Sequence, residues 1–204
     1  SNDAFSFGNR IASDDAYRFS KGEVVTANNG MRARLRRPLD FVVIADHAEN
    51  MGISASNQEV EEKEREDFNR SVWSEVITAA ERHNDPGKFT AFAGYEWSGG
   101  KFVGEFNGNK VGNYLHRVVV FKDGVDKTKK IVPLSSLEGP NPEDLWAFMD
   151  RYERNTNGSV LSIPHNSNIS GGSMFLPERF NGKPINREYA EMRSRWEPLV
   201  EVTQ

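Results

Sequence analysis

Short apolar runs along the chain have the length and the bounding residues of β-strands. Each is limited by glycine, proline or charged side chains, the residues that commonly end strands. They cover residues 39–45, 89–95, 117–121, 160–163 and 199–203. The first run is nearly unbroken, which is typical of a strand buried on both faces in a parallel sheet.

Two longer stretches have the periodicity or the boundary signals of helices. In residues 57–83, apolar side chains recur three and four positions apart, which predicts one long amphipathic helix. The sequence Asn141-Pro142-Glu143-Asp144 combines a cap, a proline at the first helical position and two acids, so a second helix is predicted from there to Asn157-Gly158. A shorter helix is predicted to begin at Ser13.

Strands that alternate with helices predict βα units in a parallel sheet or barrel, within a single domain over residues 1–204. Two segments lack a clear pattern. The glycine-rich residues 98–114 are predicted to form a long exposed loop and the rim of a pocket, and residues 167–198 are predicted to be irregular.

Composition excludes several classes of protein. The chain has 204 residues, 37% of them hydrophobic and 27% charged, as in an ordinary globular protein with a sizeable core. A net charge of −4 without a basic stripe argues against a general nucleic-acid binder. The absence of cysteine excludes disulfides, thiolate catalysis and cysteine-type zinc sites. No apolar run approaches the roughly 20 residues of a membrane span.

Residues capable of binding metal lie at the boundaries of the predicted strands. His47 follows the first strand, Glu96 ends the second, His116 precedes the third and His165 follows the fourth. In α/β enzymes, the carboxyl ends of strands present the catalytic groups. Neutral imidazoles and carboxylates bind zinc, manganese or iron, and a carboxylate can bridge two ions. Together these residues indicate a metal site.

Each of these residues also has a structural alternative. A histidine after a strand is more often a hydrogen-bonded structural residue than a ligand. Glu96 would fit a buried carboxylate paired with an arginine, and His116 would fit a partner of another carboxylate. His165 would fit a turn with Asn166. The remaining histidine, His83, lies in the last turn of a predicted helix, where a cation suits the helix dipole.

Several segments resemble a known superfamily. Residues 41–49 (FVVIADHAE), 94–97 (GYEW) and 163–166 (IPHN), with the strand after His116, resemble the successive motifs of the PHP superfamily, the polymerase and histidinol phosphatase type. Residues 3–5, 14–22 and 142–146 resemble more closely the uncharacterised PHP-like family DUF3604. The resemblance implies an α/β fold, a distorted (β/α)7 PHP-type barrel. It also implies two or three divalent metal ions, zinc, manganese or iron, and the hydrolysis of phosphate esters.

The resemblance also implies roles for individual residues. The implied metal ligands are His47, Glu96 as the bridging carboxylate, His116, His165 and Asp3. For the intact protein we further expect Asp46 to orient a ligand imidazole or to act as a base near the bound water, with Glu96 as the other catalytic residue. We also expect Arg117 and Asn166 to contact the substrate.

Two motifs of the superfamily have no counterpart in this sequence. The His-x-His motif would precede Ser1 and the Asp-x-His motif would follow Gln204, so we expect a fragment with an incomplete barrel and metal site, itself inactive. For the intact protein we expect a phosphoesterase acting on a small phosphorylated substrate, without nucleic acid as a partner. Hydrolysis of an amide or another ester and a degenerate, non-catalytic binding module are the alternatives.

Overall fold

The computed structural model describes residues 8–50, 62–106 and 109–203. It is a mixed α/β structure, as predicted from the alternation of strands and helices. The chain divides into two compact units. The first unit comprises Ser1–Tyr95 and Phe121–Pro133, and the second comprises Glu96–Val120 and Leu134–Gln204. The sheet that carries the longer strands has the order β3-β4-β7-β8.

The first unit contains helices, short strands and most of one long strand. Its elements are α2 (Ser13–Ser20), β1 (Val25–Thr26), β2 (Arg32–Ala33), β3 (Phe41–Val43), the 3-10 helix η1 (Ala48–Asn50), α3 (Glu62–His83), β4 (Thr90–Trp97) and α4 (Val125–Thr128). β1 and β2 are antiparallel, whereas β3 pairs with β4 in parallel, with Val42 opposite Ala91. The predicted helix over residues 57–83 is confirmed for the part from Glu62 onward, and residues 57–61 lie outside the described residues.

Aromatic side chains form the core of the first unit. The Trp73 ring of α3 lies 6.1 Å from that of Tyr95 and 5.8 Å from that of Phe121. The indole N–H of Trp73 donates a hydrogen bond of 3.0 Å to the carbonyl of Thr128, which satisfies the one polar atom of this buried ring. The apolar stripe of α3 thus packs inward.

The first predicted strand differs from expectation in its burial. β3 has only three residues, and the Phe41 side chain is 65% exposed. The prediction that this strand is buried on both faces is therefore wrong. β3 is an edge strand of its sheet, and an edge strand has a neighbour on one side only.

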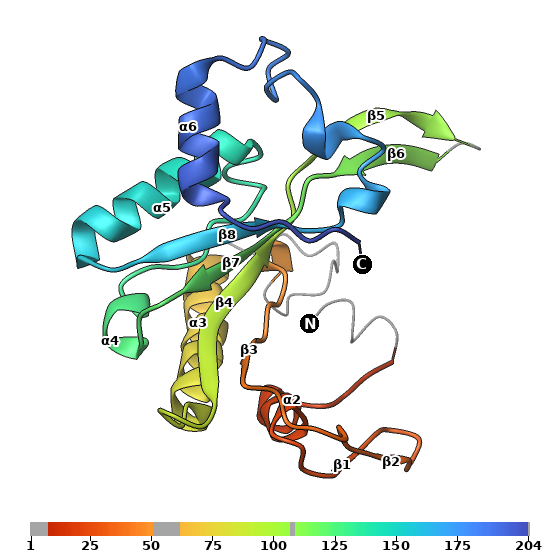
Figure 1. Ribbon diagram of the computed structural model, residues 1–204, viewed down its shortest axis with the longest axis vertical. Coiled ribbons are helices and arrows are strands. Elements are labelled where there is room, and N and C mark those ends of the chain that lie inside the picture. The colour runs from red at the N-terminus through yellow and green to blue at the C-terminus, as the bar shows by residue number, and fades with distance from the viewer. Residues whose placement is uncertain (1–7, 51–61, 107–108, 204) are drawn as a thin grey trace. The chain divides into compact units, whose positions relative to one another are not determined.

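The second unit contains a hairpin, two strands and two packed helices. Its elements are β5 (Gly100–Phe106), β6 (Asn109–Tyr114), β7 (Arg117–Phe121), α5 (Pro142–Thr156), β8 (Val160–Pro164), the 3-10 helices η2 (Ser167–Ile169) and η3 (Ser173–Phe175), and α6 (Arg187–Trp196). α5 and α6 pack against each other and against β8 (Figure 1). Trp97, Leu145 and Trp146 are fully buried in this unit.

Three predictions for the second unit are wrong. Residues 98–114 are not a loop, because β5 and β6 pair as an antiparallel hairpin with an irregularity between Phe102 and Gly104. Residues 167–198 include the helix α6, whose N-cap Asn186 accepts the backbone N–H of Tyr189 at 2.9 Å. Residues 199–203 are irregular instead of a strand.

Among the described residues, no helix combines the length and the apolar character that crossing a membrane requires.

Candidate metal centre

The second unit brings together three of the predicted metal ligands. Glu96 lies near the end of β4, His116 immediately before β7, and His165 immediately after β8. The backbone N–H of His165 donates to the carbonyl of His116 at 2.9 Å. The start of β7 therefore lies beside the end of β8, and the two strands run in opposite directions. This explains why a ligand that precedes its strand joins one that follows its strand.

One carboxylate oxygen of Glu96 is the centre of this cluster. His116 Nδ1 lies 2.8 Å from Glu96 Oε1, and His165 Nε2 lies 3.8 Å from the same atom. Glu96 is only 7% exposed, and both imidazoles are largely buried. Histidine nitrogen atoms and carboxylate oxygen atoms that converge in a buried site are typical ligands of zinc, manganese and iron.

Glu201 is a candidate site residue that the sequence did not predict. Its Oε2 lies 2.5 Å from His165 Nδ1 and also accepts the backbone N–H of Asn166 at 3.1 Å. When Nδ1 is hydrogen-bonded in this way, the Nε2 of His165 remains available on the side that faces Glu96. A carboxylate that holds a histidine by its other nitrogen is the usual support of a metal-binding imidazole. The signal in the sequence is that Glu201 is the charged residue within the apolar run 199–203.

Asn166 supplies an independent indication of a missing partner. Its backbone is left-handed, with φ of 63°, and its side chain is 6% exposed. The Nδ2 atom lies 3.4 Å from His116 Nδ1. Within the described part of the chain, the buried Oδ1 has no hydrogen-bond partner. A buried acceptor without a partner costs about 1–3 kcal/mol, so a cation or donor at this place is favourable.

The predicted site residues His47 and Asp46 belong to the first unit. The charge of Asp46 there adds to the effect of burial, the larger cause, in raising the pKa of Tyr17 to about 12. Asp3 lies outside the described residues.

Arg117, a predicted substrate contact, lies in the interior of the second unit. It is 2% exposed, and its Nε donates to Glu197 Oε1 at 3.0 Å. It also donates to the carbonyl of Leu115, and the indole N–H of Trp146 donates to the same Glu197 oxygen at 3.1 Å. Arg117 thus belongs to a buried ion-pair network. Its contact with a substrate stays a prediction.

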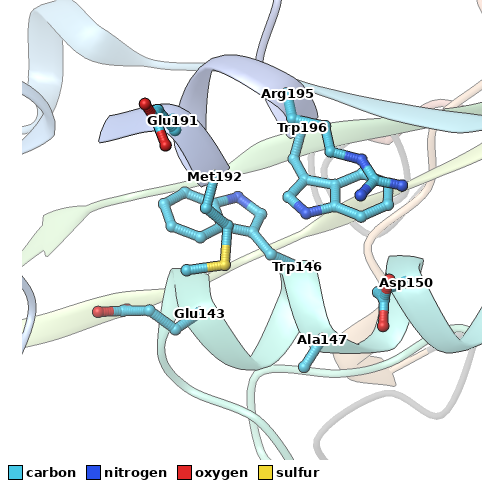
Figure 2. A pocket seen from close by; sticks show the side chains of 8 residues that line it. All are labelled: Glu143, Trp146, Ala147, Asp150, Glu191, Met192, Arg195 and Trp196. Carbon is cyan, nitrogen blue, oxygen red and sulfur yellow. The ribbon is translucent and has the colours of Figure 1, made fainter. Parts of the chain in front are cut away.

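A cavity of about 530 Å³ lies between α5 and α6, and none of the predicted metal ligands lines it (Figure 2). It is lined by Glu143, Trp146, Ala147, Asp150, Glu191, Met192, Arg195 and Trp196. Two of its carboxylates have cationic partners, because Arg154 binds Asp150 at 2.5 Å and Arg187 binds Glu191 at 2.6 Å. The residues that line this cavity are therefore different from those of the candidate metal centre.

The fold and the site together define an α/β protein with a candidate metal centre. The family model of DUF3604, described as a protein of unknown function, matches residues 1–66 and 54–204. The chain belongs to the DUF3604 family. No curated protein and no solved structure matches the chain.

Proposed function

We propose that this protein is a metal-dependent hydrolase of the PHP superfamily, a phosphoesterase acting on a small phosphorylated substrate. The distorted (β/α)7 barrel of that superfamily is part of the proposal. The observation that carries it is the oxygen of buried Glu96, which faces the nitrogen atoms of His116 and His165 at 2.8 and 3.8 Å.

The proposed ligands are Glu96, His116 and His165, with His47 as a further imidazole. The donor set fits two or three divalent ions such as zinc, manganese or iron. When bound, such ions supply an activated water and Lewis acidity toward a phosphoryl oxygen.

The chain's own residues prepare the site for this chemistry. Glu201 holds His165 by Nδ1 at 2.5 Å, which fixes both the tautomer and the direction of the ring. The buried Oδ1 of Asn166 offers a further oxygen to a cation or to a substrate hydroxyl. Burial of Glu96 strengthens its interaction with positive charge, because the surroundings screen it less than water does. In the proposal, Asp46 acts as the base or as the group that orients a ligand.

The test combines metal content with turnover. The intact protein is loaded with zinc or manganese, dialysed, and analysed by inductively coupled plasma mass spectrometry. We expect stoichiometric metal and hydrolysis of p-nitrophenyl phosphate or bis(p-nitrophenyl) phosphate. We expect the His165→Ala variant to lose metal and to reduce turnover at least about a hundredfold. His83→Ala is the matched control, since this imidazole binds Asp14 in the first unit at 2.7 Å.

The other outcomes select between the alternatives. Stoichiometric metal with turnover of carboxyl esters or amides alone would replace the phosphoesterase by another hydrolase. Substoichiometric metal in the intact wild-type protein would contradict the metal-dependent function and support a non-catalytic module.

A further inference from the structure

The second unit contains a small cavity of about 120 Å³ whose wall includes three arginines. The polar lining is formed by Arg117, Ser173, Glu178, Arg179, Tyr189 and Arg193. With roughly 30 Å³ for each liquid water molecule, the cavity has room for about four waters or for one small oxyanion. None of the residues that line it is a predicted metal ligand.

Two of the three arginines are held in place by one buried carboxylate. Arg117 Nε donates to Glu197 Oε1 and Arg193 Nε donates to Glu197 Oε2, both at 3.0 Å. The Glu197 side chain is 1% exposed, and Trp146 donates a further hydrogen bond to it. Ion pairs with this geometry leave little rotational freedom, so the two guanidinium groups are positioned before a ligand arrives.

The bonds that position these arginines leave part of each guanidinium group available. A guanidinium carries five N–H donors. Besides Nε, Arg117 uses Nη1 to the carbonyl of Leu115, and Arg193 uses Nη2 to the carbonyl of Met174 at 3.0 Å. Glu197 already accepts three hydrogen bonds, so a ligand with further acceptor oxygens would engage donors of this wall that these bonds do not use.

Arg179 is the third cation, and it precedes α6. Its guanidinium lies over the Tyr189 ring, 5.3 Å from the centroid. Among the described residues, its buried Nε has no hydrogen-bond partner. Among the described residues that line the cavity, the charged ones are the three arginines and Glu178, and Glu197 pairs with Arg117 and Arg193.

We infer that this cavity binds a small tetrahedral oxyanion, phosphate or a phosphate group of a larger molecule. Its size suits such a group, the buried Nε of Arg179 has no acceptor among the described residues, and three arginines line its wall with the single carboxylate of Glu178. The inference does not rest on the proposed hydrolase function. His116 faces Glu96 while its neighbour Arg117 faces Glu197, so the two sites use different partners.

The test measures binding of inorganic phosphate by isothermal titration calorimetry. The chain is kept in EDTA, and sodium chloride holds the ionic strength constant, so that neither a metal ion nor general screening produces the signal. We expect one saturable site per chain and at least a tenfold loss of affinity in Arg179→Gln. Arg187→Gln is the matched control, because this arginine of α6 is 90% exposed, pairs with Glu191 and lies outside the cavity.

Further measurements make the result decisive. The His165→Ala variant is expected to bind phosphate with wild-type affinity even if it fails in metal binding, which separates this site from the hydrolase proposal. Ser173→Ala, expected to weaken binding severalfold, replaces Arg179→Gln if that variant does not fold. Absence of saturable binding, or equal affinity in Arg179→Gln, would overturn the inference. Acetate binding more tightly than phosphate would also overturn it, in favour of a planar carboxylate.

Discussion

Two glutamates of the second unit with buried side chains, Glu197 and Glu96, have different kinds of partner. Glu197 accepts hydrogen bonds from two guanidinium groups and an indole, so permanent positive charges and a neutral donor satisfy it. Glu96 instead faces two imidazoles at 2.8 and 3.8 Å. The neighbours His116 and Arg117 contact different carboxylates. Burial of a carboxylate therefore does not by itself indicate a metal ligand, and the type of partner distinguishes a structural ion pair from a candidate site.

The largest expected effect comes from breaking the structural ion pair. Glu197→Gln leaves the buried Arg117 and the partly buried Arg193 without their anionic partner, so we expect a loss of about 3–5 kcal/mol in the free energy of unfolding, measured with urea. Glu191→Gln removes an exposed i,i+4 pair with Arg187 on the same helix, and its expected cost is below about 0.5 kcal/mol. Equal losses in the two variants would contradict the structural role of Glu197.

The next effect tests the support of the candidate metal centre. Glu201→Gln weakens the hydrogen bond that orients His165, so we expect metal affinity to fall about 10–100-fold while the fold remains intact. Competition with a chelator measures the affinity, and circular dichroism checks the fold. Glu188, an exposed acid in the first turn of α6, provides the control Glu188→Gln. Unchanged metal affinity in Glu201→Gln would show that the carboxylate has only a structural role.

The smallest effect concerns a histidine–carboxylate pair at the surface of the first unit. The hydrogen bond from His83, and contacts with Arg82, hold the pKa of Asp14 below its ordinary value of 3.8 despite partial burial. A carboxyl with a lowered pKa stabilises the fold above that ordinary value, and this stabilisation is lost as the pH falls through the folded value. Because Asp14 is 49% exposed, Asp14→Asn should cost less than about 1 kcal/mol at neutral pH.

Urea unfolding at a series of pH values measures this difference. We expect the loss in Asp14→Asn to shrink as the solution is acidified below pH 3.8, the ordinary value for this carboxyl. We also expect a smaller loss when His83 is already alanine. A loss independent of both pH and His83 would contradict the assigned cause.

Features with local causes could be predicted from the sequence. The start of α5 is an example, because Asn141 and Asp144 form a capping box in which the Asn141 backbone N–H donates to the Asp144 carboxylate at 3.1 Å. The positions of Glu96, His116 and His165 at strand boundaries were also visible in the sequence, whereas their approach depends on the opposite directions of β7 and β8. These signals lie within a few residues of the feature that they predict.

Features that depend on distant partners could not be predicted in this way. The hairpin β5–β6 is defined by backbone pairing over a glycine-rich segment, in which side-chain alternation is weak. The contact of Glu201 with His165 joins residues 36 positions apart in the chain. The opposite directions of β7 and β8 depend on how the strands pair, which a local sequence pattern does not show. The signals of α6 were present in Asn186 and the amphipathic residues after it, but the surrounding glycines and prolines obscured them.

The segment from Glu197 to Glu201 has a practical consequence for shortening this protein. Glu197 neutralises the buried arginines, whereas Glu201 fixes His165 and, through its own backbone N–H, binds the carbonyl of Pro164 at 3.1 Å. A stop codon placed before Glu197 would therefore remove a structural anion and a ligand-orienting group together. The boundary chosen for expression would then decide whether a loss of metal binding reports on the candidate ligands or on folding, and a chain that keeps Glu201 avoids that ambiguity.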